Sequence, residues 1–221
     1  GVTDALTYDK QSRVNTFAHV NYKGDDKRLG VLLCINGTGI LNNWVKQNMA
    51  SGKSYQQINE AASDISVGAN GLVVLPFGNG AERMLNNKIV GAHFLNIDFN
   101  VHTQAHIFRA VQEGVAFAFR YGLDIMRESG MNPQVIRAGK SNMFLSPLFT
   151  EAFVNATGVP VELYASDGSV GAAIGAGIGA GIFSEKNAFN NAKPVQVVAP
   201  SNTETYDALY QKWKAALQKH L

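Results

Sequence analysis

The sequence predicts a three-layer α/β domain in which helices pack against a sheet. Short apolar or alternating segments, bounded by Gly, Asn and Pro, alternate with segments of helical periodicity along the chain. One helical segment, which begins at Thr103, is long enough to act as the structural spine of the domain. The sequence contains no internal repeat and no linker long enough to divide it, so we expect residues 1–221 to form a single domain.

The first third of the chain predicts two strands followed by two helices. Residues 8–20 alternate loosely, and residues 30–35 form a continuous apolar run that is typical of a strand buried on both faces. The Gly-containing segment 36–39 ends this run, and apolar residues at helical spacing follow it: Ile40, Leu41, Trp44 and Val45. Ser54 and Gln57 match a capping box that begins the second helix. Its core-facing residues are expected to be Tyr55, Ile58, Ala62 and Ile65.

The middle of the chain predicts a buried strand and the long helix. Residues 71–80 form an apolar strand that ends at a proline and glycines, and residues 81–100 are rich in loop-forming residues, with a short mixed strand after Gly91. The long helix has one apolar stripe: Ile107, Ala110, Val111, Val115, Ala118 and Phe119. Arg109 and Glu113 lie on a polar stripe of this helix at the spacing of an i, i+4 ion pair.

The next segments predict a strand, a capped helix and another strand. Residues 133–139 form the first strand. Ser146 is expected to be the N-cap of the helix, with Pro147 in its first position and Gly158 just beyond its end. Residues 160–165 form the second strand.

Two helices of different character complete the chain. Residues 171–182 form a helix of small residues, in which Gly171, Gly175 and Gly179 leave one face without side chains. Since each glycine inside a helix costs about 1 kcal/mol relative to alanine, we expect another helix or a sheet to approach this face closely. The amphipathic helix 202–221 is expected to bury one stripe: Tyr206, Leu209, Tyr210, Trp213, Ala216 and Leu217.

Composition excludes several functional classes. Charged residues make up 16% of the chain, hydrophobic residues make up 46%, and the net charge is +2, which indicates a compact domain and argues against a nucleic-acid partner. The most apolar stretch, residues 168–183, is too short to cross a membrane. Cys34 is the only cysteine and lies in an apolar run, so we expect a core residue, no disulfide and a cytoplasmic location.

Two glycine-containing turns are candidate binding elements. Gly139, Ser141 and Asn142 directly follow a strand, where backbone N–H groups can point toward an anion or a polar nucleoside edge. The alternative is a plain tight turn followed by an ordinary N-cap at Ser146. The segment 37–39 also opens a helix after a strand, and two such turns in one domain favour a shared cleft. The spacing differs from that of a Walker A loop.

Other polar groups have structural interpretations. His102 and His106 have an i, i+4 spacing that can hold zinc, but no third ligand is evident and no metal site is expected in this chain. Glu82 and Arg83 follow a Gly-rich turn and are interpreted as a loop-anchoring ion pair in preference to catalytic groups. The residues by themselves predict an α/β domain with a nucleotide-type cleft.

Four segments resemble the FGGY carbohydrate kinases in the right order, over about residues 8–185. The segments are GLVVLPFGNGAER, HIFRAVQEGVAFAFR, IRAGKSNMFLSPLFTEAFVNATGVPVEL and VGAAIGAGIGAG. The resemblance is to the C-terminal, nucleotide-side domain of that family. It implies an RNase H-like (actin-like ATPase) fold, with a mixed central sheet and helices on both faces.

The resemblance also implies an activity. Members use ATP and Mg²⁺, held in a cleft between two domains, to phosphorylate the hydroxyl of a ketose, most closely D-xylulose, by in-line transfer. The catalytic Asp and the sugar contacts belong to an N-terminal kinase domain that this chain does not contain. We therefore expect no catalytic residue here, weak nucleotide binding, and no turnover by the isolated chain.

The nucleotide-binding residues implied by the resemblance come from two parts of the chain. Gly39 and Asn43 fall on the adenine wall, and Tyr55 takes the place of an aromatic residue near the adenine. The glycine-rich turn is replaced by GKSN, so Gly139, Ser141 and Asn142 are candidates, with the two polar side chains reaching the adenosine. The position of the purine-contacting polar residue falls on Ser146. The candidates are Gly39, Asn43, Tyr55, Gly139, Ser141, Asn142 and Ser146.

Two alternatives stay open. The altered glycine motif is compatible with a non-catalytic actin-like module for regulation or assembly. Within the same family, ribulose, a fructose-type ketose or glycerol are other candidate substrates. Homodimer formation is also open.

Overall fold

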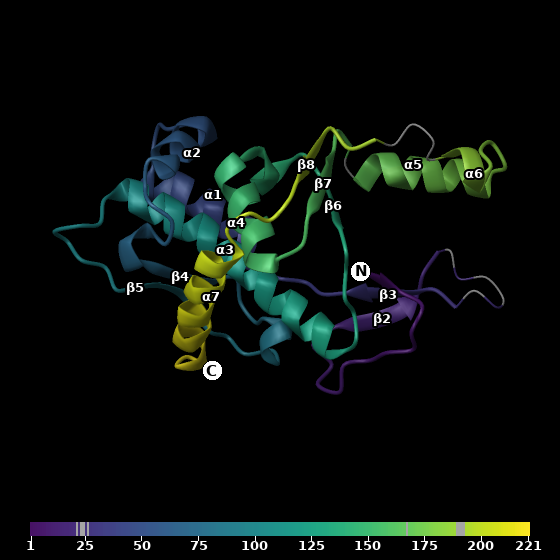
Figure 1. The fold of residues 1–221 in the computed structure, drawn as a ribbon, viewed down its shortest axis with the longest axis horizontal. Helices are drawn as coiled ribbons and strands as arrows, with labels where there is room; N and C mark the ends of the chain where they lie inside the picture. Colours follow the sequence, from purple (N-terminus) through teal and green to yellow (C-terminus); the bar gives the residue numbers. More distant parts are fainter. Residues whose placement is uncertain (21, 23–24, 26, 167, 189–192) are drawn as a thin grey trace.

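Figure 1 presents the computed structural model, which describes residues 1–221 except 21, 23–24, 26, 167 and 189–192. The described strands are β1 (Val2–Thr3), β2 (Asn15–Ala18), β3 (Leu29–Leu32), β4 (Val73–Phe77), β5 (Gly91–Leu95), β6 (Ile136–Gly139), β7 (Val161–Tyr164) and β8 (Gln196–Val198). The described helices are α1 (Thr38–Met49), α2 (Tyr55–Ser63), α3 (Gln104–Glu128), α4 (Pro147–Thr157), α5 (Gly168–Gly179), α6 (Glu185–Ala188) and α7 (Thr203–Gln218). Short 3₁₀ turns lie at η1 (Ala69–Gly71), η2 (Arg83–Leu85) and η3 (Asn142–Leu145).

The strands form three small sheets, which corrects the expectation of one mixed central sheet. Their orders are β1-β3-β2, β4-β5 and β6-β7-β8, and β6–β7 is the parallel pair. Strands β4 and β5 pair antiparallel, with Val73 opposite Leu95. Each strand is short, with two to five residues, and the described strands pair only within these three sheets.

Helix α3 is the spine around which the other elements pack. It has 25 residues and is buried on nearly every side along its middle, where it contacts α1, α2, α4, α7 and β4 (Figure 1). Gly114 allows α3 to lie against β4, because a Cβ there would collide with the Val74 carbonyl oxygen. Thr103 and His106 form a capping box at its start. The predicted long helix is confirmed.

The predicted Arg109–Glu113 ion pair is confirmed, but it is buried inside the domain. Arg109 Nε lies 2.7 Å from Glu113 Oε1, and both side chains are nearly inaccessible to solvent. The Glu113 carboxylate also accepts the backbone N–H of Gly68 at 3.0 Å. Burial raises the pKa of Glu113 despite the neighbouring guanidinium. The pair ties α3 to the segment that precedes β4.

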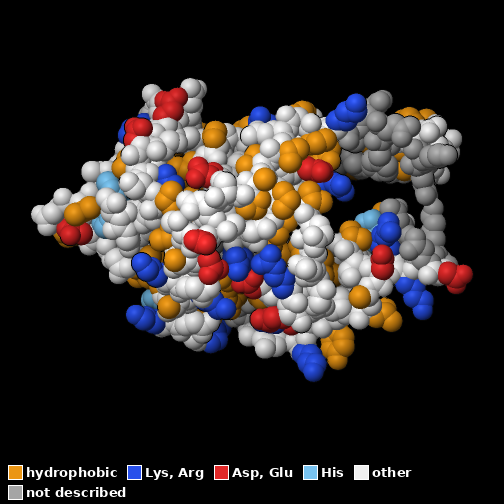
Figure 2. All heavy atoms as spheres, viewed as in Figure 1, with side chains coloured by type: hydrophobic (Ala, Val, Ile, Leu, Met, Phe, Trp, Pro, Cys, Tyr) orange, Lys and Arg blue, Asp and Glu red, His pale blue; other side chains and the backbone are white. Residues whose placement is uncertain are grey.

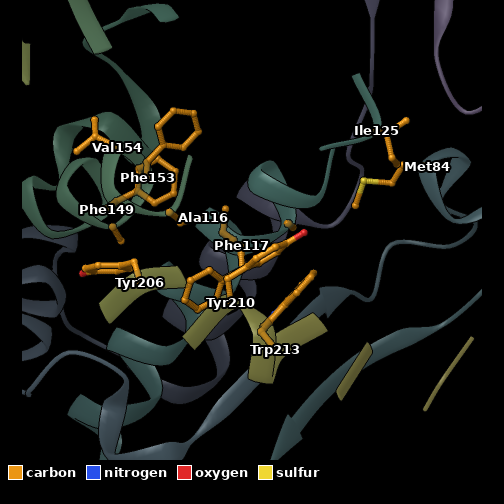
Figure 3. Close-up of a cluster of buried hydrophobic side chains, with 14 of the residues drawn as sticks. Met84, Ala116, Phe117, Ile125, Phe149, Phe153, Val154, Tyr206, Tyr210 and Trp213 are labelled. Carbon is orange, nitrogen blue, oxygen red and sulfur yellow. The ribbon is translucent and has the colours of Figure 1, made fainter. Parts of the chain in front are cut away.

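Aromatic residues of α7 complete the core. Tyr206, Tyr210 and Trp213 point toward Phe117 of α3 (Figure 3), with ring centroids 6.2–6.4 Å from the Phe117 ring. The Trp213 Nε1–H donates to the Val74 carbonyl oxygen at 2.8 Å, which satisfies the buried indole. The predicted buried stripe of the final helix is confirmed for Tyr206, Tyr210, Trp213 and Leu217.

The apolar run 30–35 is not a strand buried on both faces. Strand β3 ends at Leu32, whose side chain is 48% exposed, and Cys34 is exposed instead of lying in the core. Successive residues of extended chain point to opposite sides. Val31 therefore enters the core, while Leu32 and Cys34 lie at the surface.

The small-residue helix does not pack through its glycine face. Figure 1 shows α5 and α6 projecting from the rest of the structure. A Cβ built on Gly171, Gly175 or Gly179 would meet no atom within 4 Å, whereas one on Gly177 would meet the ring of Phe183. The expected close approach is wrong because α5 packs mainly on the short α6.

The local signals were more accurate than the long-range ones. The Ser54–Gln57 capping box forms as predicted, and Ser146 caps α4 with Pro147 in the first turn. Of residues 8–20, only Asn15–Ala18 forms a strand.

Charges of both signs lie on the face of the molecule that Figure 2 draws. Lys and Arg side chains are interspersed with Asp and Glu on the face drawn in Figure 2. Among the described residues, none of the helices has the length and apolar character required to cross a membrane.

Candidate nucleoside pocket

A pocket of about 810 Å³ lies between α1, α2, the middle of α3, and the segment that connects β6 to α4. All seven candidate residues predicted from the sequence line it. The complete lining is Thr38, Gly39, Asn42, Asn43, Tyr55, Asn59, Gln112, Phe119, Ala138, Gly139, Ser141, Asn142, Met143, Phe144, Leu145, Ser146 and Phe149. The fold therefore brings together candidate residues that are as much as 107 positions apart in the chain (39 to 146).

The first wall comes from α1 and α2. A Cβ on Gly39 would meet no atom within 4 Å, so the absence of a side chain leaves room in the pocket at the start of α1. The Tyr55 hydroxyl donates to Asn43 Oδ1 at 3.3 Å, which joins the two helices at the pocket. Tyr55 is 43% exposed, so it lies at the pocket surface and not in the core as the helical stripe predicted.

The opposite wall is the turn after β6. Gly139 is required by packing, because a Cβ there would lie 2.5 Å from the Ser166 carbonyl oxygen. The next turn is fixed by the Lys140 N–H, which donates to the Tyr164 carbonyl oxygen at 2.8 Å. Asn142 adopts a left-handed conformation with φ of 50°, which asparagine tolerates better than most residues. This geometry brings both Ser141 and Asn142 to the pocket.

A chain of buried hydrogen bonds forms the floor. The Ser146 hydroxyl donates to Gln112 Oε1 at 2.7 Å and accepts the Phe149 N–H at 3.3 Å. Gln112 Nε2 donates to Asn59 Oδ1 at 3.1 Å. Gln112 is 1% exposed and therefore links α2, α3 and α4 beneath the pocket. Because its hydroxyl has two partners, Ser146 holds the pocket floor as an N-cap.

Gln112 and Asn59 also line the pocket, although no motif in the sequence marks them. The signal available was a carboxamide, Gln112, in the middle of a helix long enough to lie across the core. Such a residue is buried only when it is hydrogen-bonded, and its partners are 34 and 53 positions away.

The pocket lining is electrically neutral. It combines carboxamides and hydroxyls with the apolar faces of Phe119, Phe144 and Phe149, and the described residues that line it include no Lys, Arg, His, Asp or Glu. A neutral aromatic ring with polar edges is the ligand type that such a lining suits, because the ring faces become buried and the edges find donors and acceptors.

A buried carboxylate binds the turn that leads into α1. Glu82, which is completely buried, accepts the N–H groups of Asn36 and Gly37 at 3.0 Å. Burial raises its pKa, although the two N–H groups act in the opposite direction. The interpretation of Glu82 and Arg83 as an ion pair is wrong. Arg83 Nε instead donates to the Ser12 carbonyl oxygen at 2.8 Å, because the two neighbouring side chains have different partners.

Other features stand apart from this pocket. A second pocket of about 680 Å³ lies between the second half of α7 and the η1–β4 segment, and none of the seven candidate residues lines it. His102 and His106 contact each other with ring centroids 5.4 Å apart. Among the described residues, they belong to no group of three or more side chains suited to a metal.

Comparison with known proteins gives one family. The profile of the "FGGY family of carbohydrate kinases, C-terminal domain" matches residues 6–180. A curated relative, the xylulose kinase of Staphylococcus xylosus, is 25% identical over 96% of this chain and 44% of that protein.

Solved structures have the same fold. The xylulose kinase of Rhodospirillum rubrum superposes with a TM-score of 0.80 at 24% identity, over 99% of this chain and 44% of that one. The Plasmodium falciparum glycerol kinase with ADP gives a TM-score of 0.83 at 18% identity, with the same coverage. The chain thus spans less than half the length of these relatives.

Proposed function

Because this chain belongs to the FGGY family of carbohydrate kinases, we propose that its neutral pocket binds the adenosine part of ATP or ADP. The observation that carries the proposal is the lining itself. Seven residues selected from the sequence as adenosine contacts line one pocket whose polar groups are all uncharged. The glycerol kinase of similar fold was solved with ADP, which supports a nucleotide as the ligand class.

Each wall has a role in this proposal. The adenine ring packs against the apolar faces in the pocket, and the carboxamide of Asn43 and the turn of Gly39 contact one side of the nucleoside. Ser141 and Asn142 reach it from the opposite side with their side chains. Tyr55 orients Asn43 through the hydrogen bond between them. Hydrogen bonds of this kind contribute about 1 kcal/mol each, so binding by this chain alone is expected to be weak.

In this proposal, the pocket lining does not contact the phosphates or Mg²⁺. Mg²⁺ prefers carboxylate and phosphate oxygens, and the described pocket residues include no carboxylate, so they do not fit a metal ion. We propose that the triphosphate extends out of the pocket. The ketose and the catalytic Asp belong, in the same proposal, to the other half of a longer kinase.

The activity of the whole enzyme is proposed from its relatives. Curated relatives that cover most of this chain are named xylulose kinases, which favours D-xylulose as the phosphorylated ketose. We expect ketose-dependent ATP consumption only when the chain is joined to an N-terminal kinase domain. A coupled assay with a panel of ketoses and polyols tests this, and activity from the isolated chain would contradict it.

Binding by the isolated chain tests the pocket separately. Calorimetric titration with adenosine, ADP and ATP is expected to give dissociation constants within about threefold of each other, because no charged group contacts the phosphates. Gly39→Leu fills the pocket and is expected to weaken adenosine binding at least about tenfold, since it buries a side chain where the ligand lies.

Gly171→Leu is the matched control, because Gly171 is also a helical glycine with open space around it but lies outside the pocket. It is expected to leave the affinity unchanged. Equal binding by the Gly39→Leu protein, or a strong preference for ATP over adenosine, would contradict the proposed site.

A further inference from the structure

Glu82 is a buried carboxylate that is held by backbone N–H groups. It has no exposed surface, and its two oxygen atoms accept the Asn36 N–H at 3.0 and 3.1 Å. Oε1 also accepts the Gly37 N–H at 3.0 Å. The ion pairs found among the described residues do not include Glu82. A buried charge in this setting needs a compensating environment.

The turn before α1 supplies part of that environment, although burial still outweighs it and raises the pKa of Glu82. Gly37 is the N-cap of α1, so its N–H is one of the first N–H groups, which have no partner within the helix, and Asn36 directly precedes it. The carboxylate also faces the positive end of the helix dipole, which favours a negative charge. The contact joins two elements that are 45 and 46 positions apart in the chain.

The same turn is fixed from other directions. Asn36 Nδ2 donates to the Ala81 carbonyl oxygen at 2.9 Å, and Asn79 Nδ2 donates to the Asn36 carbonyl oxygen at 3.1 Å. Gly37 lies so close to β4 that a Cβ would overlap the Pro76 carbonyl oxygen. One side of the turn is therefore locked to the end of β4.

The other side of the turn is the pocket wall. Thr38 and Gly39, which follow Asn36 and Gly37, both line the pocket. A displacement of the turn by a fraction of an ångström would move Thr38 and Gly39 into or away from the space in which the ligand lies. The residues that Glu82 holds, Asn36 and Gly37, are thus directly continuous with the residues that line the pocket.

We propose that Glu82 is a positioning residue for nucleoside binding. Its carboxylate fixes the first turn of α1, and through it Thr38 and Gly39, without contacting the ligand. This inference rests on the proposed function of the pocket.

Glu82→Ala and Glu82→Gln test the inference in the 221-residue chain. Glu82→Ala removes both acceptors, so hydrogen exchange of the Asn36 and Gly37 amides, followed by NMR, should accelerate at least about tenfold. Adenosine affinity, measured by calorimetry, should fall about tenfold. Glu82→Gln keeps one acceptor oxygen of nearly the same shape and should restore the affinity to within about threefold of the wild type.

Tyr210→Phe is the control for general loss of stability. It removes a buried hydroxyl that donates to Asp124 at 2.8 Å, on an element that does not line the pocket. It should leave adenosine affinity unchanged. An equal loss of affinity in this variant would mean that the effect of Glu82→Ala is not specific, and would overturn the inference.

The remaining outcomes separate a failure of the inference about Glu82 from a failure of the proposed function. Faster exchange at Asn36 and Gly37 with unchanged adenosine affinity would overturn the inference and leave the proposed function intact. Absence of adenosine binding by the wild type would overturn the proposed function itself. If Glu82→Ala does not fold, Glu82→Asp replaces it as the test, because it retracts the carboxylate by one methylene. It is expected to weaken adenosine binding threefold or more. An unchanged adenosine affinity would overturn the inference.

Discussion

Gln112→Met tests the buried network beneath the pocket. Methionine has a similar length and no hydrogen-bonding amide, so the change removes the acceptor of Ser146 and the donor to Asn59 with little change in volume. Two lost hydrogen bonds contribute about 2 kcal/mol, and the buried Ser146 hydroxyl left without its acceptor adds about 1 kcal/mol or more. We therefore expect the free energy of unfolding to fall by about 3 kcal/mol.

Urea unfolding followed by tryptophan fluorescence measures this loss, because the Trp213 indole is 1% exposed in the native state. Gln56→Met is the matched control, since Gln56 is exposed on α2 and hydrogen-bonds only to Glu60 among the described residues. It should change stability by no more than about 0.5 kcal/mol. A loss of less than about 1 kcal/mol for Gln112→Met would refute the view that its two hydrogen bonds join the helices.

Two further predictions concern α5 and the pH dependence of stability. Gly171→Ala should increase the hydrogen-exchange protection of α5 by up to about fivefold, because alanine is favoured over glycine in a helix by about 1 kcal/mol. The added methyl group would meet no atom within 4 Å. Reduced protection would mean that another element packs on this face. Burial raises the pKa of Glu82 above its ordinary value of 4.5, so its contribution to stability is complete below that pH and is lost as pH rises through the native pKa. Glu82→Gln removes this pH dependence, so its stability should rise relative to that of the wild type as pH increases above 4.5. Urea unfolding at several pH values measures the difference. A gain of the wild type relative to the variant would contradict the direction of the pKa shift.

The elements that the sequence predicted well are those determined by neighbouring residues. Helix α4 is fixed by the cap at Ser146, the proline after it, and Gly158 with φ of 69°. Each of these signals acts within one turn of the helix end at which it lies. The stripe of α7 repeats often enough to define one buried face. Strand pairing depends instead on distant partners, so the division into three sheets was not visible in the apolar pattern.

Burial was the least predictable property. Cys34 and Gly171 lie in apolar or small-residue runs, yet both are exposed, because composition gives no information about what covers a face. Glu82 illustrates the opposite case: a carboxylate beside an arginine suggests a loop-anchoring ion pair, but Glu82 is fully buried and binds backbone N–H groups.

The candidate site depended on the family resemblance more than on spacing. Ser141 and Asn142 followed from a turn after a strand, but Asn43 and Tyr55 could be joined to them only by the order of motifs. Gln112 and Asn59 were missed because their partners come from three separate helices, and no local pattern links them.

A crystal structure of this chain with ADP tests the central claim most directly. The proposal predicts that the adenosine lies in the pocket of about 810 Å³, with Asn43, Ser141 and Asn142 in contact with it and the phosphates directed outward. Adenosine bound beside Trp213 in the other pocket would contradict it. So would adenosine in the predicted pocket with no atom of Ser141 or Asn142 within about 4.5 Å.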